Sequence, residues 1–270
     1  MPKTPPLPKS LTPKPKRPGQ NGNGNGNGKV TTKEAIGTGG IHAVDWIDER
    51  ASASAGIRWL LFRKVPRGVN WFYTLGSATL FAFLAQAVTG VFLAMYYRPD
   101  ATGGAYESMR YIVDQAFLGQ FVRGMHKWGA SVMVILIFLH MGRTFFFGAY
   151  KYPREMTWII GVVLLILTLV MSFTGYLLPF DDRAYLATIV GVNINGTAPF
   201  LGPYLSDFLR AGPEFGATTL SRFYAIHMLL VPGLIIALIG AHLYLITKLG
   251  IAAPPWVKSH EDPELDVTEV

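Results

Sequence analysis

Apolar residues after position 68 are gathered into long runs, and most charged residues lie between these runs or near the two ends of the chain. Residues 69–97, 156–180 and 223–247 contain no Asp, Glu, Lys or Arg. Each run exceeds the roughly 20 residues with which an α-helix crosses about 30 Å of hydrocarbon. The three runs therefore predict three membrane-spanning helices.

A fourth run, at residues 121–150, carries charge inside its limits. Its uncharged part, residues 128–142, is short for a span and is flanked by Arg123, Lys127 and Arg143. Basic side chains at such positions either extend toward the membrane surface or neutralise an acidic group inside the protein. We therefore predict an all-α integral membrane protein, a four-helix transmembrane bundle with amphipathic helices on the membrane surface.

The two ends of the chain differ from the bundle in composition. Residues 1–34 combine prolines, an Asn-Gly repeat and seven basic residues, and this composition predicts a disordered tail. Residues 35–68 mix aromatic with charged side chains, as expected either of an amphipathic segment on the membrane surface or of an ordinary polar linker. Residues 69–250 form the predicted bundle, and residues 251–270 form an acidic C-terminal tail.

Charge and cysteine content exclude several functions. The formal net charge of +7 equals the contribution of the seven basic residues before Glu34, so no folded basic face is left to bind nucleic acid. The chain has no cysteine, which excludes disulfides, iron–sulfur clusters and thioether-linked haem from it. Lys and Arg are concentrated in the N-terminal segment and around residues 143–154, and such segments stay on the cytoplasmic side of a membrane. Both termini are then cytoplasmic, and the helices at 121–150 and 223–247 run in the same direction.

Four histidines lie inside these two parallel helices: His126 and His140 in one, His227 and His242 in the other. Because a helix rises about 1.5 Å and turns about 100° per residue, the first pair is roughly 21 Å and about 40° of azimuth apart. The second pair is roughly 22 Å and about 60° apart. The depths match: His126 lies level with His227 on the outer side, and His140 lies level with His242 on the inner side.

Two sites of two histidines each favour one kind of ligand. The two histidines of one helix are too far apart to share an ion, and a zinc site needs three or four ligands close together. A haem iron takes two axial imidazoles from opposite sides. We therefore predict two non-covalent b-type haems, one held by His126 and His227 and the other by His140 and His242. A lone buried histidine more simply bonds a neighbouring helix, but four at matched depths favour haem.

Glycines on the other two spans repeat the histidine spacing. Gly76 and Gly90 are separated by the same interval as His126 and His140, and so are Gly161 and Gly175. A glycine lets a bulky ring approach the backbone closely, although glycine is frequent in membrane helices. These four glycines are the predicted edges of the two haem sites.

Haem propionates are anionic and need cationic partners. Arg123 lies three residues before His126, and Arg143 lies three residues after His140. Each arginine is thus about one helical turn from a predicted ligand. We predict both as propionate partners, although the preference for basic residues on the cytoplasmic side explains Arg143 nearly as well.

The order of several segments resembles the cytochrome b family in its short split form, which occurs in plastid-type cytochrome bf complexes and in some bacteria. The segments are VPRGVNWFYTLG, MHKW, LHMGRTFFFGAYKYPREMTW, TGYLLPFDD, LSDFLRAG and SRFYAIH. The second histidine pair has fourteen intervening residues, as in the split form. The resemblance implies the same four histidine ligands and four glycines, in a multi-pass subunit of a bacterial cytoplasmic membrane.

Two positions depart from the family pattern, and one family motif is absent. Thr74 stands where split-form members commonly carry a cysteine that anchors an extra haem, which argues against a covalent third haem. Thr247 stands where the family often has an arginine, which leaves the inner quinone contacts open. The chain also lacks the Pro-Glu-Trp-Tyr motif whose glutamate accepts the quinol proton in the family. In split systems a second cytochrome b chain, with the C-terminal helices, carries that motif.

The resemblance therefore implies a di-haem subunit of a quinol:cytochrome c oxidoreductase, or of one with a plastocyanin-like acceptor. Quinol oxidation outside would send one electron to a Rieske-type iron–sulfur protein and a c-type cytochrome, and the other across two haems to quinone inside. Tyr176, Pro179 and Phe180 are the candidate walls of the outer quinol pocket, although an aromatic belt explains Tyr176 and a helix end explains Pro179. We expect a homodimer of the whole complex.

Two other functions stay open. A two-haem membrane anchor of a dehydrogenase would use the same chemistry without splitting the electron path. A histidine-relay proton transporter would need ionisable residues across the midplane, and residues 128–139 and 228–241 contain none.

Overall fold

The computed structural model describes residues 45, 46, 48 and 65–257. The chain divides into two units with the boundary between residues 63 and 64, and all helices named below belong to the second unit. The predicted basic tail, nearly all of the predicted amphipathic segment and the end of the acidic tail lie outside the described residues. These three assignments stay predictions.

The second unit is built of helices, and residues 65–257 contain no strand. One turn of 3-10 helix, η1, leads into α3, and one turn of π-helix, η2, joins α9 to α10 without a break. In chain order the elements are η1 (Trp71–Thr74), α3 (Leu75–Ala94), α4 (Gly104–Asp114), α5 (Gly119–Phe146), α6 (Glu155–Leu177), α7 (Asp182–Gly196), α8 (Gly202–Arg210), α9 (Ala217–Ala225), η2 (Ile226–Leu230) and α10 (Val231–Leu249).

The four predicted spans are confirmed. Four helices are long and apolar enough to cross a membrane: Trp71–Ala94, Gly119–Phe146, Glu155–Leu177 and Ala217–Leu249. Many of their apolar side chains, such as Phe81, Val88 and Leu229, stay largely exposed within the described residues. Such faces are those that a bundle presents to lipid or to other subunits.

The ends of the spans differ from the predicted limits for local reasons. The second span begins at Gly119, after Leu118 takes a left-handed conformation with φ of 55°. The third span ends at Leu177, two residues before Pro179, which has no N–H to continue the helix. The fourth span begins already at Ala217, because the polar turn with Arg222 is helical as well.

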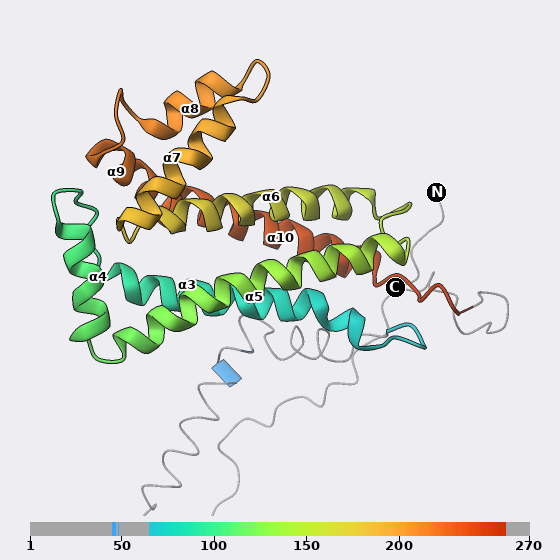
Figure 1. Ribbon diagram of the computed structural model, residues 1–270. Helices are drawn as coiled ribbons and strands as arrows, with labels where there is room; N and C mark the ends of the chain where they lie inside the picture. The colour runs from blue at the N-terminus through green and yellow to red at the C-terminus, as the bar shows by residue number, and fades with distance from the viewer. Residues whose placement is uncertain (1–44, 47, 49–64, 258–270) are drawn as a thin grey trace, which may run out of the picture. The chain divides into compact units, whose positions relative to one another are not determined.

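The spans pack in two layers. α3 packs along α5, and α6 packs along α10, while α5 touches α6 more lightly (Figure 1). α5 and α10 are not among the closely packed helix pairs of the described residues. The two histidine-bearing helices therefore approach each other through side chains rather than through their backbones.

Short helices close one end of the bundle, where the sequence predicted connections with surface helices. α4 follows α3, and α7, α8 and α9 lie between α6 and α10 at the same end (Figure 1). α4 buries Ala105 and Ile112 on one side, as an amphipathic helix does. The carboxylate of Asp181 accepts a hydrogen bond from the N–H of Ala184 at 2.8 Å and so caps the start of α7.

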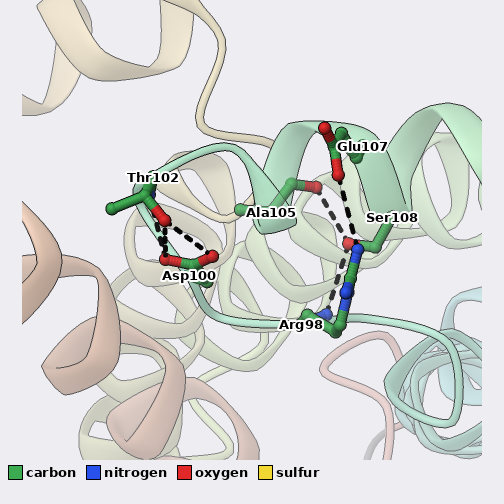
Figure 2. Close-up of polar contacts among 6 residues, drawn as sticks. All are labelled: Arg98, Asp100, Thr102, Ala105, Glu107 and Ser108. Carbon is green, nitrogen blue, oxygen red and sulfur yellow. Dashed lines mark hydrogen bonds and ion pairs between the residues drawn. The ribbon is translucent and has the colours of Figure 1, made fainter.

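A polar turn joins α3 to α4 at this end (Figure 2). The Asp100 carboxylate accepts hydrogen bonds from the backbone N–H of Thr102 at 2.9 Å and from its hydroxyl at 2.8 Å. These bonds lower the pKa of Asp100, because they favour the charged form. The Arg98–Glu107 ion pair, at 3.5 Å, is exposed on both sides and contributes little. The hydrogen bonds of Asp100 therefore stabilise this turn more than the ion pair does.

One arginine closes the opposite end of the bundle. The guanidinium of Arg154, directly before α6, donates to the carbonyl oxygens of Leu249 at 3.2 Å and Gly250 at 3.3 Å. These carbonyls belong to the C-terminal end of α10, which carries partial negative charge. Arg154 thus ties the start of the third span to the end of the fourth.

Candidate functional site

The structure brings the four predicted histidines together in two pairs. His126 of α5 faces His227 of η2, with ring centroids 6.5 Å apart and ring planes at 75°. A metal ion bonded to one nitrogen of each of two imidazoles, with bonds of about 2 Å, separates the ring centroids by roughly 6 Å. We call this pair the first level. Its separation fits one metal ion between the two rings.

His140 of α5 and His242 of α10 form the second level. They lie close enough to interact electrostatically, and the guanidinium of Arg143 is near His140 as well. No group of three or more His, Cys, Asp or Glu side chains able to hold a metal occurs within the described residues. The geometry of the first level therefore fits ligation by two imidazoles, and neither level offers, within the described residues, the three or four ligands of a zinc site.

Each histidine ring lies against one of the four predicted glycines. A Cβ atom added to Gly175 would lie 2.5 Å from Cε1 of His227, and one added to Gly90 would lie 3.2 Å from Cε1 of His126. At the second level the distances are 3.1 Å from Gly76 to His140 and 3.5 Å from Gly161 to His242. A side chain at three of these four positions would displace a ring, so the glycines leave the space that the rings occupy.

The π-turn explains why the second histidine pair is spaced by one residue more than the first. The N–H of Val231 bonds the carbonyl of Ile226, five residues back, so one turn holds an extra residue. Pro232 follows at once, and a helix commonly widens where a proline lacks its N–H. With one residue absorbed, His227 and His242 repeat the azimuth difference of His126 and His140, about 40° rather than about 60°. The difference between the two azimuth angles expected from regular helices therefore disappears.

Hydrogen bonds orient the first-level rings. Nδ1 of His126 lies 2.9 Å from the hydroxyl oxygen of Thr89. Nδ1 of His227 lies 3.2 Å from that of Thr174 and 3.0 Å from the carbonyl oxygen of Met171. A histidine held at Nδ1 keeps Nε2 free to bind a metal.

Polar atoms without partners gather at the second level. Within the described residues, the buried side-chain atoms that lack a hydrogen bond are the Tyr73 hydroxyl, Nε and Nη2 of Arg143, the Thr157 hydroxyl and Nδ1 of His242. They come from all four spans. Buried polar groups in native proteins are nearly always bonded, so this end of the bundle fits a further polar group.

The guanidinium of Arg143 indicates the charge and shape of that group. Its guanidinium stacks 3.6 Å above the centroid of the Tyr73 ring and 5.1 Å from that of Phe147. Nε and Nη2 of Arg143 are buried and unpaired within the described residues, although the whole side chain is half-buried. Two such N–H groups match a carboxylate, which accepts them side by side. A haem propionate is such a carboxylate, and the residues present therefore fit haem at this level.

The remaining predicted residues lie near the first-level end. Arg123 is half-buried on α5, one turn before His126. Tyr176, on α6, is 50% exposed, so it faces away from the core. Pro179 is half-buried. Phe180 takes a left-handed conformation with φ of 51° and packs edge-on against Tyr185 at 5.8 Å.

A tyrosine that the sequence reasoning missed fixes this turn. The hydroxyl of Tyr97, after α3, donates to the carbonyl oxygen of Leu178 at 2.5 Å, and its ring stacks on Tyr224. Burial, and secondarily Tyr224, raises the pKa of Tyr97, so the hydroxyl stays protonated and keeps donating. Thr89, Thr174 and Tyr73 were missed too. Their signal was in the sequence, since two precede a predicted glycine directly and the third lies three residues before one.

Comparisons with known proteins agree with this geometry. A family model described as Cytochrome b/b6/petB matches residues 61–250. The menaquinol:cytochrome c reductase cytochrome b subunit of Geobacillus thermodenitrificans is 43% identical over 218 residues, which cover 78% of this chain and 97% of that protein. Cytochrome b6 of Heliobacterium modesticaldum is 38% identical over 213 residues, which cover 78% of this chain and 100% of that protein.

A solved structure shares the fold. A chain of the "Hyperthermophilic respiratory Complex III" matches with a TM-score of 0.73 and 30% sequence identity, over 82% of this chain and 59% of that chain. This chain thus spans less than two thirds of that solved chain. The all-helical membrane fold predicted from the sequence is confirmed. Because the family model covers most of the described bundle, the chain belongs to the cytochrome b/b6 family, whose members bind haem and interact with quinol.

Proposed function

We propose that this chain is the di-haem cytochrome b subunit of a quinol:cytochrome c oxidoreductase complex, or of one with a plastocyanin-like acceptor. The observation that supports it most is the arrangement of four histidines in two pairs at two depths, each ring against a glycine. Two such pairs at two depths provide two bis-imidazole sites along one path through the bundle. A histidine relay for protons would gain nothing from glycines at the ring edges.

The four histidines would hold the irons of two non-covalent b-type haems. When bound, the haems supply two one-electron carriers between the faces of the membrane. His126 and His227 present Nε2 because their Nδ1 atoms are occupied. At the second level, Arg143 and Tyr73 would hold a propionate, and Arg123 would do so at the first level. The Thr74 hydroxyl donates to the Trp71 carbonyl at 2.7 Å, and with no thiol there we propose no covalent third haem.

The orientation of the bundle in the membrane follows from the basic residues near the ends of the spans. Arg143, Lys151 and Arg154 surround the short connection between α5 and α6, which supports a cytoplasmic location for the second-level end. Both termini would then be cytoplasmic, in a bacterial membrane. The first level and the helices α4 and α7 to α9 would lie toward the outside.

Quinol oxidation would take place at the first-level end, with Tyr176, Pro179 and Phe180 as the pocket walls. The Tyr97 hydroxyl supports this proposal, since it fixes the carbonyl of Leu178 at the start of the turn that carries Pro179 and Phe180. The proton acceptor would come from a second cytochrome b chain with the C-terminal helices. A Rieske-type iron–sulfur protein, a c-type cytochrome and a second copy of the whole complex would complete the assembly.

Haem content tests the proposal directly. We expect the purified chain to contain two haems, both extracted by acidified acetone and both of b type in the pyridine spectrum. Fewer than two haems per chain, or haem that resists extraction, would contradict it. Mass spectrometry of co-purified subunits separates the two haem-based functions: a Rieske-type iron–sulfur protein with a c-type cytochrome supports quinol:cytochrome c oxidoreduction, and a flavoprotein dehydrogenase supports the anchor function.

A further inference from the structure

Two threonines on different helices hold the first-level histidines in the same way. Thr89 precedes Gly90 on α3, and Thr174 precedes Gly175 on α6, so both glycines of this level follow a threonine. Each hydroxyl oxygen lies within hydrogen-bond distance of a histidine Nδ1, at 2.9 and 3.2 Å. Both threonines are buried, with 7% and 0% of their surface exposed.

The direction of these hydrogen bonds follows from what else the hydroxyls do. Thr89 donates to the carbonyl oxygen of Ala85 at 2.7 Å, and Thr174 donates to that of Val170 at 2.9 Å. With its proton used, each hydroxyl oxygen accepts from the histidine, and Nδ1 carries the proton. The carbonyl of Met171, 3.0 Å from Nδ1 of His227, can only accept and requires the same tautomer.

The second level lacks this arrangement. The residues before Gly76 and Gly161 are Leu75 and Ile160, which have no hydroxyl. Nδ1 of His242 is buried and makes no hydrogen bond of normal geometry within residues 65–257, although the backbone of Thr157 lies nearby. The buried guanidinium of Arg143 adds positive charge at this level. The surroundings of the two pairs therefore differ in both hydrogen bonding and charge.

We propose that Thr89 and Thr174 are positioning residues that fix the tautomer of the first-level histidines and lower the reduction potential of the haem held there. The proposal rests on the haem ligation proposed above. A histidine that donates its Nδ1–H to an oxygen becomes a more basic ligand, and a more basic ligand favours ferric over ferrous iron.

Valine tests this role because it keeps the shape of threonine and removes the hydroxyl. We expect Thr89→Val and Thr174→Val to retain two haems and to raise the midpoint potential of one of them. The rise should be larger for Thr89→Val, because the carbonyl of Met171 still accepts from Nδ1 of His227 in Thr174→Val. The ferrous-to-ferric ratio of that haem at fixed potential should rise about threefold to tenfold, where tenfold corresponds to about 59 mV for one electron. The second haem serves as the internal reference and should not move. Thr89→Ser and Thr174→Ser should restore the wild-type potential.

Thr168 offers a matched control on α6. It is buried, with 5% exposed, and donates to the carbonyl of Leu164 at 2.8 Å without a histidine contact. Thr168→Val should leave both potentials unchanged. If Thr174→Val loses a haem, the pair Thr174→Ser and Thr174→Ala gives the same comparison with a smaller side chain. Two haems with potentials unmoved by loss of either hydroxyl would overturn the inference, whereas a wild-type chain without two haems would overturn the proposed function instead.

Discussion

The two histidine levels of this bundle have the same arrangement of two histidines and two glycines, but they differ in hydrogen bonding and charge. At the first level both rings are anchored at Nδ1, by Thr89 and Thr174. At the second level Nδ1 of His242 and the guanidinium of Arg143 are buried without normal hydrogen bonds. A first level with hydrogen-bonded histidines thus lies roughly 21 Å along α5 from a second level that fits an anionic partner.

This difference shows how one repeated pattern can hold two unequal sites. The spacing of the histidines and glycines along the four spans provides two equivalent places for a flat ring, one at each level. The neighbours of these residues then make the sites unequal, through a hydroxyl at one level and a buried cation at the other. Most of the experiments below compare a change at one level with the other level, and the last one changes a site far from both.

Removing an iron ligand should have the largest effect. His227→Leu is expected to lower the haem content from two to one per chain and to leave the second-level haem, and His242→Leu is expected to do the reverse. Pyridine haemochromogen assays give the content, and redox titration identifies the haem that remains. The pairing is wrong if His227→Leu and His140→Leu remove the same haem.

Changing the register of one helix should be next in size. Deletion of Ile135 from α5 should rotate His140 by about 100° and abolish the second-level haem, because no irregular turn can absorb the change. Deletion of Leu229 should convert the π-turn to α-helix and keep both haems. The haem content of the two purified variants tests this difference. An equal loss of haem from both variants would contradict the proposed role of η2.

Substitution of each of the four glycines by alanine should weaken haem binding to different extents. Gly175→Ala would place a Cβ 2.5 Å from the His227 ring, whereas Gly161→Ala would place one at an ordinary 3.5 Å from His242. We expect the first to weaken haem binding by about 1–3 kcal/mol, as overpacking does, and the second to be tolerated. Gly240→Ala, which meets open space, is the control. Haem loss during denaturant titration measures the series, and a uniform response would argue against ring contact.

Loss of the buried cation should affect only the second level. Arg143→Gln should weaken retention of that haem by about 1.5–3 kcal/mol, as expected for a lost hydrogen bond to a charged group. Tyr73→Phe should have a smaller effect of the same kind. Haem transfer to apomyoglobin gives the two loss rates, and faster loss from the first level would place the propionates elsewhere.

The smallest effect is expected far from both levels. The lowered pKa of Asp100 means that its carboxylate stabilises the fold above the ordinary Asp value of about 3.9, and that this contribution is lost as pH falls through the lowered value. Asp100→Asn should reduce the melting temperature slightly at pH 7 and converge with wild type in acid. Thermal unfolding monitored by circular dichroism checks this, and a difference that grows in acid would have the wrong sign.

The sequence predicted the spans and the histidine levels because both depend on long-range regularity. Uncharged runs of more than 20 residues permit few other structures in a membrane protein. The missed features depend on single contacts between helices. The hydrogen bond from Tyr97 to Leu178 and the stacking of Arg143 on Tyr73 join residues far apart in the chain. The π-turn at His227 was missed because a helix was assumed regular there, although Pro232 marked the place.

A density map of the purified protein tests the central claim most directly. We predict two flat haem-shaped features, one between His126 and His227 and one between His140 and His242, each edged by two of the four glycines. A propionate of the second feature should lie against Arg143. A map in which the imidazoles of either pair meet with no planar density between them would contradict the account.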